Sequence, residues 1–147
     1  MKPLNEMELC FDSRSSNESF ARAAVSAFIA QLDPTVGELN DVKTAVSEAV
    51  TNCVVHAYQN TIGKIRIQVR LLEDAAVLIK ISDKGCGIED IPRAMEPLYT
   101  TSPGEDRAGL GFAVMQSFTD QIRVRSSVGK GTTVTMKKRL SRRLSNG

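Results

Sequence analysis

The stretch EAVTNCVVHAY, residues 48–58, decides the fold and raises the question of function. At about 100° per residue, the apolar side chains in and around it gather on one side of a helix from about residue 35 to 58. These side chains, which mark a face packed on a core, are Leu39, Val42, Val46, Val50, Cys53 and Ala57. Glu48, Asn52 and His56 recur at intervals of four residues and form a separate stripe. A carboxylate, a carboxamide and the only histidine of the chain therefore share one helix face.

Glu48 and Asn52 lie one turn apart, so they can hold a hydroxyl group and a cation side by side. Mg²⁺ prefers oxygen ligands and is usually completed by waters and substrate phosphates, so one amide oxygen is a typical protein contribution. Glu48 is then placed to accept the proton of an attacking hydroxyl as a general base. Taken alone, the pair is better explained as the exposed side of an ordinary helix. His56 has no partners at zinc-ligand spacing, which favours a structural histidine.

Composition indicates one domain of ordinary globular character. The chain has 147 residues, of which 41% are hydrophobic and 24% charged. It has no apolar run near the ~20 residues of a membrane span, and acids near its start argue against a signal peptide. Its odd count of three cysteines, with no metal-ligand spacing, favours free thiols and a cytoplasmic location.

Charge is unevenly distributed along the chain. The segment 137–147 holds five cations and no acid, so the net charge of +2 leaves the remainder at about −3. Aromatic residues make up only 5%, and no basic stripe is apparent outside this tail. We therefore expect no direct contact with nucleic acid and no membrane attachment.

Alternating apolar residues predict strands at 7–11, 65–71 and 77–83, of which the last two form an antiparallel hairpin. A closing hairpin is expected at 121–139, around the turn GKG. Ser15 and Glu18 suggest a capping box at the start of a first helix. Short helical residues at 91–95 and a helix from Gly109 complete an α+β architecture, with strands in one layer and helices in the other.

The motif Asp83-x-Gly85-x-Gly87 ends one of these strands. Asp83 continues the apolar face of its strand, and burying a carboxylate without partners is costly. A flat heteroaromatic ring with an exocyclic amine could lie against the two glycines while Asp83 accepts a hydrogen bond from the amine. The alternative is a tight turn, for which Asp and Gly are common.

Gly109 and Gly111 open a helix after the polar loop YTTSPGEDRAG, residues 99–109. Helix N-terminal amides favour anions, and glycines let a phosphate approach closely. An ordinary junction between loop and helix is the alternative. The chain has no GxxxxGK[ST] motif, and the glycines do not follow a strand in a βαβ unit, which excludes a P-loop and disfavours a dinucleotide fold.

In this order, and followed by Gly131-Thr132 in a strand, the motifs resemble the GHKL ATP-binding family, which includes gyrase and histidine kinases. The segments SEAVTNCVVHAY, SDKGCGI, PLYTTSPGEDRAGLGFAVM and GKGTTV are most similar to its branch of sporulation serine-protein kinases that are anti-sigma factors. The resemblance covers nearly the whole chain. It implies the GHKL (Bergerat) fold, a two-layer α/β sandwich with a mixed, mostly antiparallel sheet, over residues 1–138, followed by a basic tail at 139–147.

The resemblance also implies roles for single residues. Asn52 would hold Mg²⁺ against the ATP phosphates, Glu48 would be the general base, and Asp83 would bind the adenine amine. Residues 100–108 would form a lid over the nucleotide. The remaining implied nucleotide-binding residues are Gly85, Gly87, Thr101, Arg107, Gly109, Gly111 and Thr132.

The activity implied by the resemblance is that of a kinase and an anti-sigma factor. With Mg-ATP it would phosphorylate a serine of an anti-anti-sigma protein, and it would bind a sigma factor of RNA polymerase, with ATP or ADP selecting the partner. A homodimer is implied. Arg22, a lone charge on an apolar helix, is a candidate partner contact or a solvated residue. Two alternatives are a histidine-kinase-type ATP-binding domain, although the one histidine lies inside the ATP motif, and a nucleotide-gated binding module, against which Glu48 argues.

Overall fold

Strands and helices alternate irregularly along the chain in the computed structural model, which describes residues 3–95 and 106–141, with the backbone alone for 93, 94 and 106–111. The elements are β1 (Asn5–Asp12), α1 (Asn17–Ile29), η1 (Ala30–Leu32), α2 (Val36–Asn52), η2 (Cys53–Ala57), β2 (Lys64–Leu71), β3 (Ala76–Asp83), α3 (Ile91–Ala94), α4 (Asp106–Phe118), β4 (Gln121–Ser127) and β5 (Gly131–Arg139). Within the described ranges, no helix has the length and apolar character needed to cross a membrane.

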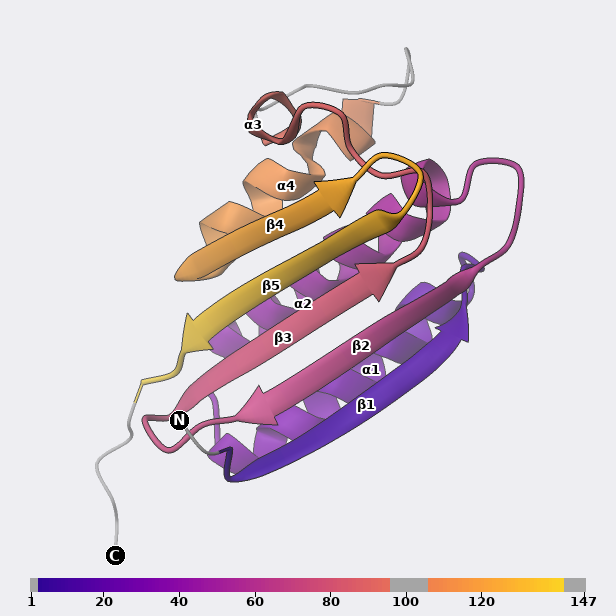
Figure 1. Cartoon of the computed structure of the whole chain (residues 1–147). Coiled ribbons are helices and arrows are strands. Elements are labelled where there is room, and N and C mark those ends of the chain that lie inside the picture. Colours follow the sequence, from indigo (N-terminus) through magenta and orange to yellow (C-terminus); the bar gives the residue numbers. More distant parts are fainter. Residues whose placement is uncertain (1–2, 96–105, 142–147) are drawn as a thin grey trace, which may run out of the picture.

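The strands form one sheet in the order β1-β2-β3-β5-β4, and α1, α2 and α4 cover only one of its faces (Figure 1). The predicted α+β sandwich of two layers is therefore confirmed. Every neighbouring pair of these strands is antiparallel. The expectation of a mixed sheet is therefore wrong for the described strands, although its mostly antiparallel character is confirmed. Both predicted hairpins, β2–β3 and β4–β5, are present.

Alternation along the strands builds the core between sheet and helices. Ile65, Ile67 and Val69 of β2 are fully buried, and α2 packs Val46 and Val50 against them from the helical layer. Polar residues between them face away, as period-2 alternation requires. The same alternation brings Asp83, the last residue of β3, to the inner face, where it is only 9% exposed. The prediction of a buried carboxylate is confirmed.

The predicted capping box at the first helix is wrong. The N-cap residue of α1 is Ser16, which makes no hydrogen bond from its side chain to the helix backbone. Glu18 is engaged elsewhere, because its Oε2 accepts a hydrogen bond from Thr51 Oγ1 of α2 at 3.0 Å. A capping box does occur at α2, where Thr35 and Glu38 satisfy each other's backbone N–H groups. This box fixes the start of the helix that carries the polar stripe.

The predicted helix of residues 35–58 is present but changes type near its end. After Asn52 it widens into the π-helical segment η2, a form common at functional sites.

At the C-terminal end, the folded domain extends past the boundary expected at residue 138. Leu140 is 3% exposed and its N–H donates to Ala75 O at 2.8 Å, while Ser141 N donates to Glu38 Oε2 at 2.6 Å. Residues 142–147 of the expected tail lie outside the described residues.

The turn between β4 and β5 generates the first prediction. Gly131 has a φ of 114°, and a Cβ on it would lie 2.1 Å from the carbonyl oxygen of Asp83. Gly129 also has a positive φ, 80°, but a Cβ there would meet nothing within 4 Å. We expect Gly129→Ala to lower the free energy of unfolding by about 1–2 kcal/mol through backbone strain alone. Gly131→Ala should cost more than about 3 kcal/mol, because the overlap with β3 adds to the strain.

Urea unfolding followed by circular dichroism measures both losses. Equal losses for the two variants would show that the close approach to Asp83 places no extra demand on residue 131.

Candidate functional site

Asp83 lies where three separate segments meet. Its Oδ1 accepts hydrogen bonds from the backbone N–H of Gly85 at 2.9 Å and of Thr132 at 3.2 Å. Its Oδ2 accepts one from the thiol of Cys53 at 3.4 Å. The carboxylate is thus held by its own loop, by β5 and by the end of the α2 helix. Burial raises the pKa of Asp83, and the hydrogen bonds from Gly85, Cys53 and Thr132 partly oppose that rise.

The loop after Asp83 is pressed between the helix end and the β4–β5 turn. A Cβ on Gly85 would lie 2.2 Å from Ala57 O, and one on Gly87, where φ is 80°, would lie 2.3 Å from Ser127 O. Cys86 N donates to Ala57 O at 2.9 Å, and Cys86 O accepts from Gly129 N at 2.7 Å. Both glycines are therefore required by contacts within the protein, a role that the sequence motif does not reveal.

Tyr58 supports the same loop and was not among the predicted site residues. Its hydroxyl accepts a hydrogen bond from Lys84 N at 2.6 Å and donates one to Lys64 O at 2.7 Å. A Cβ on Gly63 would lie 2.2 Å from the Tyr58 ring, so the ring packs directly on that backbone. The signal available in the sequence was only an aromatic residue at the end of the motif helix.

Thr132, predicted to support the ring, lies opposite Asp83 in the β3–β5 register and is 8% exposed. Its Oγ1 shares a hydrogen bond of 2.8 Å with Ser126 Oγ, which also accepts from Ile88 N at 2.8 Å. Ser126 was also not foreseen. Together the two hydroxyls connect both strands of the closing hairpin to the glycine loop.

Asn52 offers unused hydrogen-bonding capacity. Both polar atoms of its side chain are buried, and neither has a hydrogen-bond partner within the described part of the chain. A buried amide without partners is costly unless a ligand satisfies it. Among the described residues no group of three or more His, Cys, Asp or Glu could hold a metal ion. The buried amide oxygen of Asn52 would fit a Mg²⁺ that takes its other ligands from phosphates and water, because Mg²⁺ prefers oxygen ligands and keeps several waters.

Glu48 and Arg22 line the same hollow, of about 460 Å³, between α1 and α2. Its wall also includes Glu18, Lys43 and Ser47. Arg22 Nη1 lies 3.5 Å from Ser47 Oγ, a long hydrogen bond, and no other hydrogen bond of this guanidinium is present among the described residues. The proposed base and the proposed partner contact are therefore neighbours in space, although they come from different helices.

The four remaining predicted residues are located less fully. Thr101 lies outside the described residues, as does most of the expected lid. Arg107, Gly109 and Gly111 belong to α4, which begins at Asp106, so the helix starts earlier than the expected start at Gly109. α4 packs against α2, the helix that carries Glu48 and Asn52.

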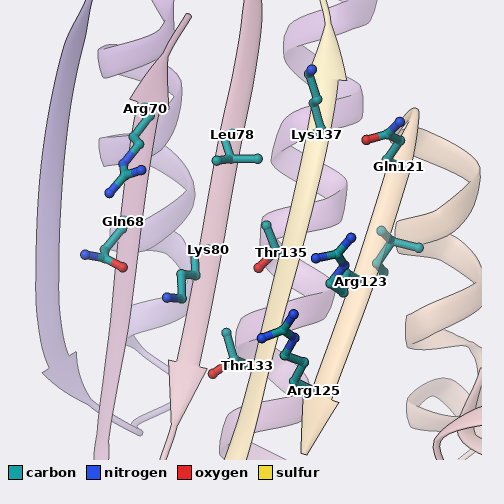
Figure 2. Close-up of a pocket in the computed structure, with 11 residues that line it drawn as sticks. Gln68, Arg70, Leu78, Lys80, Gln121, Arg123, Arg125, Thr133, Thr135 and Lys137 are labelled. Carbon is teal, nitrogen blue, oxygen red and sulfur yellow. The ribbon is translucent and has the colours of Figure 1, made fainter. Parts of the chain in front are cut away.

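A larger hollow, of about 910 Å³, lies on the uncovered face of the sheet and contains none of the predicted site residues (Figure 2). Lys80, Arg123, Arg125 and Lys137 come together there from three strands, and none of the described residues that line it is acidic. The expectation that the chain has no basic surface outside its tail is therefore wrong. These cations are dispersed in the sequence and alternate with other residues along their strands. They lie together only because β3, β5 and β4 are neighbours in the sheet.

The buried Asp83 generates a prediction on stability. The pKa of Asp83 in the folded protein is raised above its usual 3.8, so the folded state holds the proton more tightly than the unfolded state. The stability that protonated Asp83 contributes is fully present below pH 3.8, the usual pKa of the group. It is lost as the pH rises through the raised pKa of the folded protein. Asp83→Asn should therefore increase the free energy of unfolding of the nucleotide-free protein at neutral pH, and by less near pH 3.8.

Urea unfolding of both proteins across this range is the measurement. A gain that stayed the same at every pH would assign the effect to packing rather than to the buried charge.

Comparison with known proteins agrees with this arrangement. Residues 11–138 match the family model described as a histidine kinase-like ATPase domain. The chain is 57% identical over 138 residues to an anti-sigma F factor of Caldanaerobacter subterraneus, covering 94% of this chain and 96% of that protein. It is 56% identical to an anti-sigma F factor of Clostridium botulinum strain Eklund 17B, covering 93% and 96%.

Solved structures show the same fold at lower identity. The RsbU and RsbW domains of Rv1364c from Mycobacterium tuberculosis match with a TM-score of 0.70 at 22% identity, over 96% of this chain and 34% of that one. The mycobacterial sensor histidine kinase MprB matches with a TM-score of 0.56 at 15% identity, over 92% and 100%. From the family match and the identity to its relatives, the chain belongs to the histidine kinase-like ATPase family, the GHKL family that its motifs resemble.

Proposed function

We propose that the chain is an ATP-dependent serine-protein kinase that also sequesters a sporulation sigma factor. Its phosphorylation substrate would be a serine of the anti-anti-sigma protein. The observation that carries the proposal is that α2 and its continuation η2 place Glu48, Asn52 and Cys53 in succession along one helix. Glu48 lies one turn from Asn52, whose buried amide has no hydrogen-bond partner among the described residues, and the next residue, Cys53, contacts Asp83. Relatives named anti-sigma F factor, at 52–57% identity, support the sigma factor as partner.

Nucleotide recognition in this proposal begins at Asp83. Among the described residues, two backbone donors reach its Oδ1, whereas only the thiol reaches its Oδ2, which so retains capacity for the adenine amine. Asn52 would hold Mg²⁺, which when bound supplies neutralisation of the triphosphate charge. Glu48 would accept the proton of the serine hydroxyl. Phosphoryl transfer asks mainly for such positioning and charge stabilisation.

Partner binding is proposed at the hollow between α1 and α2. A serine-bearing loop that entered it would meet both Glu48 and Arg22, so recognition and chemistry would share one opening. ATP or ADP would select between the two partners through the segment 100–108, which lies in the sequence between the Asp83 loop and α4, the helix that packs against α2. Three free cysteines support a reducing, cytoplasmic location.

The implied homodimer has a candidate interface in the uncovered sheet face. Glu6 and Glu8 point outward from β1 at one edge, while Arg123 and Arg125 point outward from β4 at the other. A two-fold axis parallel to the strands would set each acidic edge against the partner's basic edge. Glu6 and Glu8 form exposed ion pairs with Arg70 and Arg66, each at 3.2 Å. Exposed ion pairs contribute little to stability, so these acids can also interact with a partner's arginines at little cost.

The kinase proposal predicts that Glu48→Gln separates the activities. Incubation with labelled ATP and an anti-anti-sigma protein, followed by mapping of the modified residue, should show transfer to serine by the unaltered chain. Glu48→Gln should slow transfer about 100-fold or more, the usual effect of losing a general base. Binding of ATP and of the sigma factor should persist, because neither needs proton transfer.

Glu73→Gln, an exposed change in the turn between β2 and β3, is the matched control and should transfer phosphate normally. Absence of transfer by the unaltered chain, with both partners still bound, would instead favour a nucleotide-gated binding module.

The dimer proposal predicts that reversing the basic edge weakens self-association. The double change Arg123→Glu and Arg125→Glu should raise the dimer dissociation constant at least ~10-fold, because like charges would then meet across the interface. Sedimentation analysis measures this, with Arg14→Glu, an exposed change outside the sheet, as control. An unaffected dimer would place the interface elsewhere.

A further inference from the structure

We infer that Cys53 is a positioning residue for nucleotide selectivity, because its buried thiol orients the carboxylate of Asp83 toward the ligand. The inference rests on the proposed function, in which Asp83 accepts a hydrogen bond from the adenine amine. It assigns a role to a residue that we first placed only among the apolar core positions of the helix.

The hydrogen bonds to Asp83 are divided unequally between its two oxygens. Oδ1 accepts from two backbone groups, of Gly85 and Thr132, which no side-chain substitution removes. Oδ2 accepts only from Cys53 Sγ among the described residues. Without the thiol, the carboxylate would be held through one oxygen. The other, to which the proposed function assigns the adenine amine, would be buried and without a protein donor among the described residues.

The thiol of Cys53 is placed to donate a hydrogen bond to Asp83 Oδ2. Cys53 is 5% exposed, and its Sγ lies 3.4 Å from Asp83 Oδ2. An ionised carboxylate oxygen only accepts, so the thiol is the donor of this hydrogen bond. A donor to the charged form of Asp83 also favours ionisation, which the acceptor role needs.

The position of Cys53 in the helix connects two parts of the site. Cys53 directly follows Asn52 and is the first residue of η2, so the contact with Asp83 ties the end of the metal-holding helix to β3. The ordinary alternative is that a buried cysteine acts as a small apolar residue. That alternative predicts changes in stability on substitution, without any change in which nucleotide is preferred.

Two nucleotides separate the alternatives. The probes are Mg-ATP and the magnesium complex of purine riboside triphosphate, which has the same ring without the exocyclic amine. Calorimetric dissociation constants give the preference for ATP in the unaltered chain and in Cys53→Ala, Cys53→Val and Cys53→Ser. Cys10→Ala, a change at an exposed thiol on β1, is the control.

Cys53→Ala and Cys53→Val should reduce the preference for ATP by ~5-fold, the effect of losing one hydrogen bond of ordinary net strength, as expected for a weak thiol donor. Cys53→Ser should restore it, because the hydroxyl is again a donor, and Cys10→Ala should leave it unchanged. The pKa of Asp83 should rise further when the thiol is absent. Affinity for ATP should therefore decline at a higher pH in Cys53→Ala as the solution is acidified.

Each outcome bears on a definite claim. An unaltered preference in Cys53→Ala and Cys53→Val, with only the melting temperature changed, would overturn the positioning role and leave the proposed function intact. Should Cys53→Ala not fold, Cys53→Val, which fills the space without a donor, decides the matter. No preference for ATP in the unaltered chain would instead overturn adenine binding by Asp83, and with it the proposed nucleotide site.

Discussion

A carboxylate buried at the end of a central strand is the constraint on which this part of the molecule depends. Asp83 can remain there only if donors reach it, and they come from the loop that follows it, from β5 and from the helix end. These segments are far apart in sequence. Satisfying one side chain therefore fixes the relative position of the sheet, the closing hairpin and α2, which is also the relative position of the proposed nucleotide-binding groups.

Small residues and a π-helical segment make this convergence possible. Gly85 and Gly131 lie where a Cβ would overlap the backbone of a neighbouring segment, at 2.2 Å and 2.1 Å. The π-helical widening at Cys53 turns the helix end so that a thiol reaches β3 and the carbonyl of Ala57 reaches the glycine loop. Gly85, which was predicted to contact the nucleotide, thus has a separate, internal function that it shares with Gly131, because both let neighbouring backbones approach each other.

Sequence periodicity was sufficient to predict the elements and the inward position of Asp83, because both follow from local alternation. It also identified the stripe of Glu48 and Asn52. It could not identify Tyr58, Ser126 or the donor role of Cys53, since each acts through a partner more than five residues away. The capping box at Ser15 failed for the same reason: the Glu18 side chain, locally suited to a cap, is used by Thr51 of another helix.

Asn52 and Asp83 each carry a polar side-chain group whose burial destabilises the fold, and both groups are suited to bind a ligand. The polar side-chain atoms of Asn52 are buried without hydrogen-bond partners among the described residues, and the pKa of Asp83 is raised by burial. Each is a cost that the apolar core must offset, and conflicts between local chemistry and the fold tend to concentrate at functional sites. A ligand with an amine at one end and a metal-bound triphosphate at the other would relieve both. Such a ligand stabilises the folded state by mass action, so nucleotide occupancy and the order of the helix end should be linked.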